Sequence, residues 1–311
     1  MLHPLPRRAP EIKGITHWIN SEPLTIAGLK GEVILIDFWT YSCINCIRTQ
    51  PYLNAWYAKY KDKGLLIVGV HAPEFEFEKN IPNVERAVQD EKIEYPVAMD
   101  NDYATWNSFD NHYWPAKYLI NQDGQIIYTH FGEGDYDEIE QKIQDLLGLS
   151  DKMVTVNGAL QAQAGQTPET YLGYERGRNF VNQTEFKADQ PADYTIHDVT
   201  DGDWSLGGTW TVGPMGSVSE IDGAVLRMGF SAKEVYLVMY GPKDSVATLK
   251  VNGKAVTPTI NGGADVAAGG RVHFDGARLY KLIKMPTFTE NATLDVVLPK
   301  GATVNAFTFG G

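Results

Sequence analysis

The sequence predicts an α/β domain followed by an all-β domain. Between Trp18 and about Gly148, apolar runs of strand length alternate with segments whose apolar residues recur at helical spacing. From about Thr195 onward, short β-rich runs are punctuated by Gly, Asn and Asp, and helical periodicity is scarce. Residues 157–169 between these regions are small and polar, which is a linker composition. We therefore expect domains at residues 1–152 and 169–311, joined by a linker at 153–168.

The elements of the first domain follow from these patterns. Continuous apolar runs predict buried strands, Gln122-Asp123-Gly124 predicts a hairpin turn, and Pro51 predicts a kink in the first long helix. Asp135 is the expected N-cap of the last helix and Gly148 follows its end. The expected strands are 32–39, 65–70, 95–99, 117–121 and 125–130, and the expected helices are 46–60, 84–92, 103–109 and 135–147.

The second domain is expected to be an antiparallel β-sandwich or jelly roll, because many short strands follow one another at close spacing. Asn252-Gly253 is the strongest hairpin signal in the chain. The expected strands are 225–230, 234–240, 246–251, 278–283, 292–298 and 304–309.

Composition excludes several classes of function. The chain has 311 residues, with 27 Lys+Arg against 39 Asp+Glu and a formal charge of −12, which argues against binding to nucleic acid or to anionic membranes. No run approaches the roughly 18 apolar residues of a membrane helix. Residues 1–10 lack the apolar stretch of a signal peptide and are expected to form a poorly ordered arm. The chain is then either cytosolic or a soluble portion of a protein whose anchor lies elsewhere.

The two cysteines of the chain, Cys43 and Cys46, carry the predicted chemistry. They form a CxxC pair directly after a buried strand and at the start of a helix. The unpaired N–H groups of a helix N-terminus stabilise a thiolate on the first cysteine, and the second lies one turn further, where it can resolve a mixed disulfide. Half of a zinc site and a structural disulfide remain alternatives. No second CxxC is available for zinc, and so short a disulfide loop would constrain little chain.

The segment IDFWTYSCINC resembles the active-site segment of the thioredoxin superfamily, and the resemblance covers roughly residues 12–148. Asp37 matches the buried acid of thioredoxins, Pro51 their kink proline, and Trp114-Pro115 the cis-proline loop that faces the disulfide. The roughly 25 residues before Tyr95-Pro96 look like the extra element of TlpA-like thioredoxins. The resemblance implies a thioredoxin-like fold and thiol-disulfide exchange without a cofactor or a metal.

Four segments are most similar to the soluble C-terminal part of DipZ-type proteins, in which a thioredoxin-like domain precedes a β-sandwich. They are WTYSCINCIRTQPYL, HAPEFEFE, DNHYWPAKYLI and TPETYLGYERGRNF. This resemblance implies a location outside the cytoplasmic membrane and a membrane tether in the full-length protein. Cytochrome maturation is one of the roles that the resemblance implies. The resemblance also implies disulfide-containing client proteins and a membrane thiol electron donor of the CcdA/DsbD kind.

Within this resemblance, residues near the cysteines take expected roles. Many TlpA-like reductases carry a glutamate where this chain has Thr49, so Asp37 is the expected proton acceptor for Cys46, unless it is only a hydrogen-bonded strand-end acid. Pro115 is expected to press on the sulfurs, while the backbone before it pairs with an extended client. Ile44-Asn45 lacks the histidine of strong oxidases, which favours a reductase.

Other residues are expected around the site. Trp39, Tyr41 and Trp114 either contact the client or pack in the core. Glu74, with Glu76, either edges the site or is simply solvated. His71 and His112 would be needed for the alternative of a copper site with the two thiolates, and single histidines near a site are more often structural.

The second domain has no cysteine and no catalytic constellation, and its resemblance to carbohydrate-binding modules is one of fold only. Trp204, Trp210, Tyr236 and Tyr240 either stack on a glycan, grip a partner protein or form the sandwich core. The competing functional hypothesis is accordingly a binding module in which the sandwich recognises a glycan or a protein and the CxxC is a passive structural or metal site.

Overall fold

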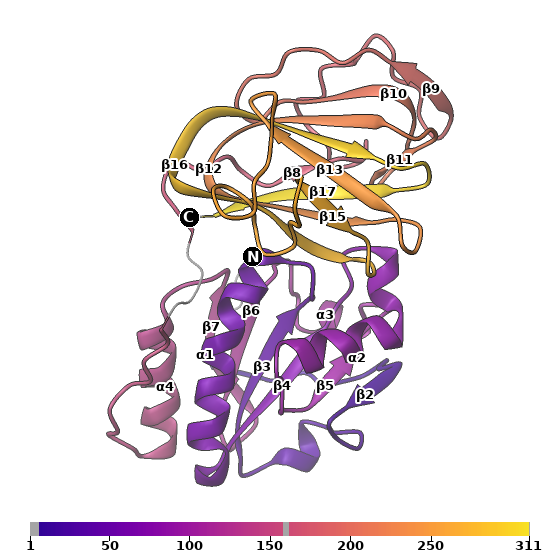
Figure 1. Ribbon diagram of the computed structural model, residues 1–311. Coiled ribbons are helices and arrows are strands. Elements are labelled where there is room, and N and C mark those ends of the chain that lie inside the picture. The colour runs from indigo at the N-terminus through magenta and orange to yellow at the C-terminus, as the bar shows by residue number, and fades with distance from the viewer. Residues whose placement is uncertain (1–5, 158–161, 311) are drawn as a thin grey trace. The chain divides into compact units, whose positions relative to one another are not determined.

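The computed structural model describes residues 6–157 and 162–310, which form two compact units (Figure 1). The first unit runs from Met1 to Ala159 and the second from Leu160 to Gly311. Among the helices of the described residues, none is both long enough and apolar enough to cross a membrane.

The first unit is built on a seven-stranded mixed sheet in the order β1-β7-β6-β3-β4-β5-β2. Strands β3, β4 and β5 run parallel to one another, whereas β6 pairs with β3, β7 with β6, β1 with β7 and β2 with β5 in the antiparallel direction. The strands are β1 (Arg7–Arg8), β2 (His17–Ile19), β3 (Val33–Trp39), β4 (Leu65–His71), β5 (Val97–Met99), β6 (Ala116–Ile120) and β7 (Gln125–Phe131).

Helices cover both faces of this sheet, which is why every residue of β3 is buried. One apolar cluster joins Leu35 of β3 to Trp56 of α1 and Ile139 of α4, and a second joins Ile36 to Trp106 of α3 on the opposite face. The helices are α1 (Ile44–Tyr60), α2 (Ile81–Asp90), α3 (Ala104–Ser108) and α4 (Tyr136–Leu147), with 3₁₀ turns at Ala27–Leu29, Lys61–Lys63 and Glu76–Lys79.

The helices differ from the expected ones mainly at their starts. Helix α1 begins two residues before the expected 46, with Cys43 as its N-cap, and α2 begins at Ile81 because the Asn80 side chain accepts a hydrogen bond from the Asn83 N–H. Asp135 is at the N-cap position of α4 without a cap hydrogen bond from its side chain, whereas Gly148 ends that helix in the left-handed conformation as expected.

The N-terminal arm is more ordered than predicted. Arg7 and Arg8 pair with β7, and Ala9 and Ile12 are buried against the sheet. The expectation of a poorly ordered arm is therefore wrong for residues 6–10, because the arm covers an edge of the sheet. Residues 1–5 lie outside the described part of the chain.

The second unit is a β structure whose ten strands pair antiparallel, dominated by the long strands β12 and β16. Each of the two joins a pair of strands that the sequence pattern predicts separately, because bulges between Phe230 and Tyr236 bend the ladder without ending it. The strands are β8 (Thr170–Tyr171), β9 (Pro191–Tyr194), β10 (Trp204–Val212), β11 (Ser217–Ser219), β12 (Ala224–Tyr240), β13 (Val246–Val251), β14 (Lys254–Ala255), β15 (Arg271–His273), β16 (Arg278–Leu298) and β17 (Thr303–Gly310).

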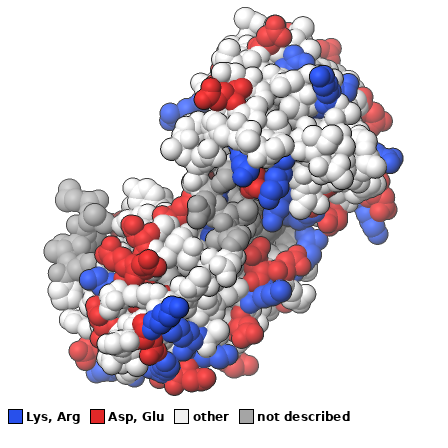
Figure 2. All heavy atoms as spheres, turned by 60° about the vertical axis from the view of Figure 1, so that its left-hand side comes forward, with Lys and Arg blue, Asp and Glu red and all other residues white. Residues whose placement is uncertain are grey.

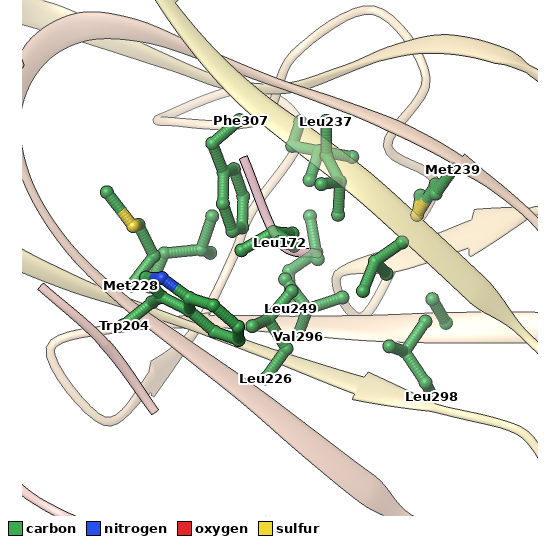
Figure 3. Packing of buried hydrophobic residues seen from close by; sticks show 14 of the residues in the cluster. Leu172, Trp204, Leu226, Met228, Leu237, Met239, Leu249, Val296, Leu298 and Phe307 are labelled. Atoms are coloured by element: carbon green, nitrogen blue, oxygen red, sulfur yellow. The ribbon is translucent and has the colours of Figure 1, made fainter. Parts of the chain in front are cut away.

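Three of the four aromatic residues considered for ligand binding in this unit are buried in its core. Figure 3 shows Trp204 among Leu226, Met228 and Val296. Trp204, Trp210 and Tyr236 are at most 2% exposed, so they cannot stack on a sugar ring in this structure. The core alternative is thus confirmed for these three, while Tyr240 is half-buried. The jelly-roll and carbohydrate-binding-module identity of the unit stays a prediction.

Candidate active site

The cysteine pair lies at the start of α1, shortly after the end of β3. Cys43 is half-buried and has extended backbone angles, and its Sγ accepts a hydrogen bond of 3.4 Å from the Cys46 N–H. Cys46 is only 3% exposed, in the first turn of the helix. Both are free thiols. The pair therefore combines a thiol that solvent can reach with a shielded one behind it.

The shielded thiol holds its proton tightly. Burial raises the pKa of Cys46 well above its ordinary value, and the hydrogen bond and charge of Cys43 raise it further. The negative charge of Asp37 acts in the same direction. Because a thiolate is the attacking species in disulfide exchange, Cys46 needs a nearby proton acceptor to react.

Asp37 is a buried carboxyl whose negative charge acts on Cys46. It lies in the middle of β3 and is 1% exposed, and burial raises its pKa to about 6, against the opposing pull of the Lys117 ammonium. Lys117 Nζ lies 3.5 Å from Asp37 Oδ1, and Lys117 is also 1% exposed. At this separation the two form an ion pair, but their geometry does not make a hydrogen bond. Asp37 is thus a buried carboxyl that can change protonation state near neutral pH.

The loop before β6 has the expected cis-proline. The Trp114–Pro115 peptide is cis, as the resemblance implies, and the Pro115 carbonyl accepts a hydrogen bond of 2.8 Å from the Gly132 N–H. The Trp114 indole N–H donates to the Ala72 carbonyl at 3.0 Å, so the loop is tied to the end of β4. Trp114 is half-buried and keeps part of its ring accessible.

The other two predicted contact aromatics are buried. Trp39 is 3% and Tyr41 is 8% exposed, and both pack on His71, Trp39 edge-on and Tyr41 with its ring stacked. Burial therefore favours the packing alternative for both residues over direct contact with a client.

The histidines do not assemble a metal site with the cysteines. Burial lowers the pKa of His71 to about 3, and its ring is enclosed by the two aromatics. His112 is exposed and lies beside Asp110. Within residues 6–157 and 162–310, no group of three or more His, Cys, Asp or Glu side chains is arranged to hold a metal ion.

Glu78 is a buried acid near the cysteines that the sequence analysis missed. Its Oε1 accepts hydrogen bonds from the N–H and the hydroxyl of Ser42, at 3.2 and 2.6 Å, and its Oε2 accepts from the N–H groups of Glu74 and Phe75, at 2.6 and 2.9 Å. Burial raises its pKa to about 7, while these donors pull it down. Glu78 thereby fixes the segment 74–78 to the residue that precedes Cys43.

The flanking acids differ from Glu78 in exposure. Glu74 is half-buried and its N–H donates to Glu78, whereas the Glu76 side chain is 85% exposed and pairs with Lys79. That Glu74 edges the site stays a prediction. In the sequence the three glutamates of PEFEFE alternate with phenylalanines in the same way, so no local signal singles out Glu78.

Arg48 is a second residue that the sequence did not single out. It is 2% exposed on α1, and its guanidinium contacts the side chain of Asn45 at 3.2 Å and that of Glu133 at 3.1 Å. Asn45 is the second residue between the cysteines, so Arg48 holds the CxxC turn to the segment that follows β7.

The second unit has a separate cavity of about 670 Å³. Tyr171, Arg176, Arg178 and Asn179 are among the residues that line it, and the Arg176 guanidinium lies 3.5 Å from the centre of the Tyr171 ring. On the face drawn in Figure 2, acidic and basic side chains lie intermingled on both units.

Comparisons with known proteins agree with the two-unit organisation. Residues 7–146 match the Redoxin family model, and residues 167–310 match the model described as "Thioredoxin like C-terminal domain". The chain is 36% identical to Protein DipZ of Mycobacterium tuberculosis over 315 aligned positions, which is 97% of this chain and 43% of DipZ. The chain therefore spans less than half the length of that relative.

Shorter relatives match slightly less than half of the chain. The thiol-disulfide oxidoreductase YkuV of Bacillus subtilis is 32% identical over 139 residues, which is 44% of this chain and 93% of YkuV. A solved thioredoxin-like protein in the oxidised form is 31% identical over 46% of this chain and 97% of its own, with a TM-score of 0.43. Through its first unit, the chain belongs to the thioredoxin-like Redoxin family, and it is related to YkuV over nearly the whole length of that thiol-disulfide oxidoreductase.

Proposed function

We propose that the chain is a protein thiol-disulfide oxidoreductase that works mainly as a reductase, with Cys43 as the nucleophile. The observation that carries this proposal is the pairing of an accessible thiol at a helix N-terminus with a buried thiol and a buried carboxyl behind it. Membership of a family that contains thiol-disulfide oxidoreductases supports it.

The proposed reaction has two exchanges. The Cys43 thiolate attacks one sulfur of a client disulfide, so that a mixed disulfide forms and the other client sulfur leaves as a thiolate. Cys46 then gives its proton to the Asp37 carboxylate, and its sulfur attacks the Cys43 Sγ. The Cys43–Cys46 disulfide forms, and the first client sulfur leaves as a thiolate. An upstream dithiol donor reduces the pair again.

The client is proposed to bind as an extended segment against the backbone that precedes Pro115. Main-chain pairing of this kind tolerates different client sequences. Trp114 and the 54% exposed Tyr113 offer apolar surface beside that backbone, and Glu74 edges the opposite loop.

The direction and the setting of the reaction are inferred from resemblance. The dipeptide Ile44-Asn45 lacks a histidine that would stabilise the reduced form, which favours a reductase. Similarity to DipZ favours a location outside the cytoplasmic membrane, a tether in the full-length protein and a membrane thiol donor of the CcdA/DsbD kind. Client proteins with disulfides are the proposed substrates.

Cysteine variants test the reaction. We expect Cys43→Ser to abolish reduction of a protein disulfide such as that of insulin, and Cys46→Ser to accumulate mixed disulfides detectable by non-reducing electrophoresis. The double variant is the control, because it can form neither species. Reduction at the normal rate by Cys43→Ser would contradict the proposal.

For the second unit we propose partner recognition, because its cavity gathers arginine and tyrosine side chains at one place. A glycan or a protein is the proposed ligand. The variant R176A/R178A should retain reduction of a small disulfide but lose activity on the native client, whereas R271A, an exposed arginine of β15, should change neither. Equal activity of R176A/R178A and R271A on that client would contradict this role.

A further inference from the structure

Three titratable side chains lie in one row across the sheet of the first unit. Asp37 of β3 is paired in register with Lys117 of β6, and Lys117 is paired with His130 of β7. Residues directly opposite one another in antiparallel strands project from the same face, with Cβ atoms about 5 Å apart. The row therefore runs sideways from the residue behind Cys46 toward the edge of the sheet.

Each member of this row has a buried polar atom without a hydrogen-bond partner among the described residues. These atoms are Asp37 Oδ1, Lys117 Nζ and His130 Nε2. The Asp37 and Lys117 side chains are 1% exposed and that of His130 is 10% exposed. Buried polar groups are nearly always hydrogen-bonded, to protein or to ordered water. Three such atoms in adjacent positions therefore leave hydrogen-bonding capacity that ordered water would satisfy.

The row ends at solvent. His130 Nδ1 lies 3.7 Å from Asp135 Oδ2, and the Asp135 side chain is 68% exposed at the start of α4. One end of the row is thus a carboxyl beside the buried thiol of Cys46, and the other end is a carboxylate in water.

We propose that the row Asp37–Lys117–His130 is the route by which the proton taken from Cys46 leaves the protein beside Asp135. The proposal rests on the proposed function, in which Asp37 receives that proton. One proton enters the row when the Cys43–Cys46 disulfide forms. It leaves the Asp37 carboxyl through water held by Lys117, is taken up at His130 Nε2 and is released from Nδ1 to Asp135 or to water. No oxidant or reductant takes part in this transfer.

The groups around His130 suit a transient carrier. Burial lowers the pKa of His130, and the positive charge of Lys117 lowers it further. A hydrogen bond with the Glu133 backbone and the charges of Asp135 and Glu138 raise it, but by less. The imidazole is thus neutral at neutral pH and free to accept a proton that it does not keep. At the other end of the row, the charge of Lys117 lowers the pKa of Asp37. The charge of Asp37 in turn raises the pKa of the Cys46 thiol and that of the Tyr95 hydroxyl.

The test compares disulfide formation with proton release in the full chain. Reduced protein is mixed in a stopped-flow instrument with an aromatic disulfide whose thiolate stays ionised and coloured, in dilute buffer that contains a pH indicator. In the parent the proton should appear together with the second thiolate. In His130→Phe the proton signal should lag, with a rate about tenfold or more below that of thiolate release.

His112→Phe is the matched control, because this exposed histidine lies outside the row and should cause no lag. His130→Gln replaces the phenylalanine variant if the latter does not fold, since an amide cannot carry a proton. If proton release and thiolate release coincided in the folded His130 variant, the proposed route would be wrong. Failure of the proposed function is distinguishable, because then Asp37→Asn would leave the rate of thiolate release unchanged.

Discussion

Replacing Lys117 by methionine tests how Asp37 is tuned. Methionine has nearly the same length but no charge, so Lys117→Met removes the ammonium that lies 3.5 Å from Asp37 Oδ1. The carboxylate then loses the group that opposes the effect of burial on its pKa. We expect the pKa of Asp37 to rise, and the proposed proton acceptor to be filled at neutral pH.

The size of the effect follows from the distance. Two unit charges 3.5 Å apart attract with roughly 5 kcal/mol at an effective dielectric constant of 20. If rearrangement of the site returns half of that, about 2.5 kcal/mol remains, which moves a titration by about two pH units. From a starting pKa of about 6, the ionised fraction of Asp37 at pH 7 would fall from about nine-tenths to about one-tenth.

The assay is the pH dependence of the resolving step, followed as release of the second thiolate by stopped-flow absorbance. The parent rate should rise with a midpoint near pH 6. The Lys117→Met rate should be about tenfold lower at pH 7 and should recover toward pH 9. The exposed Lys30→Met is the control and should follow the parent. An unchanged or lower midpoint in Lys117→Met would refute the tuning argument.

Three further predictions concern stability. Because burial raises the pKa of Asp37 from 3.8 to about 6, its stabilising contribution is complete below pH 3.8 and about 3 kcal/mol is lost as the pH rises to 6. Urea unfolding at pH 4 and pH 7 should reveal this loss in the parent and not in D37N/K117M, which removes both charges. Glu78→Ala leaves four hydrogen-bond donors without their acceptor, so it should lower the free energy of unfolding by about 4 kcal/mol. It should also make alkylation of Cys43 faster. Glu76→Ala, at an exposed ion pair, should change neither quantity. Gly229→Ala places a Cβ 2.0 Å from the Thr200 carbonyl oxygen, whereas the nearest contact of a Cβ in Gly213→Ala is 3.3 Å. Gly229→Ala should therefore lower the melting temperature of the second unit far more than Gly213→Ala. Equal melting temperatures of the two variants would contradict this prediction.

The parts of the fold that could be predicted are those with a strong local pattern. The run 32–39 is apolar throughout because helices cover both faces of β3, and Asn252-Gly253 marks the β13–β14 hairpin. Strand β10 was not predicted because Gly207 and Gly208 interrupt its pattern, and Gly208 has a positive φ, which is unusual inside a strand. Bulges, which carry no clear sequence signal, make β12 and β16 continuous.

The candidate site, too, has residues that the sequence could indicate and residues that it could not. Cys43, Cys46, Asp37 and Pro115 could be named because their spacing in the sequence matches a family pattern. Lys117 could not, because in the sequence it looks like an ordinary polar residue of a strand, although it is buried in the folded sheet between β3 and β7. Its partnership with Asp37 depends on the register of β3 and β6, which no local pattern encodes.

The continuity of β12 and β16 has a consequence for how the second unit unfolds. Strand β12 pairs with β16 on one side along nearly all its length, and on the other side with β10 in its first half and with β17 in its second half. Neither half can come loose without breaking a ladder that the other half shares. The unit should therefore open as one cooperative body, and the amide hydrogens at the centre of β12 should exchange with solvent only through that global opening.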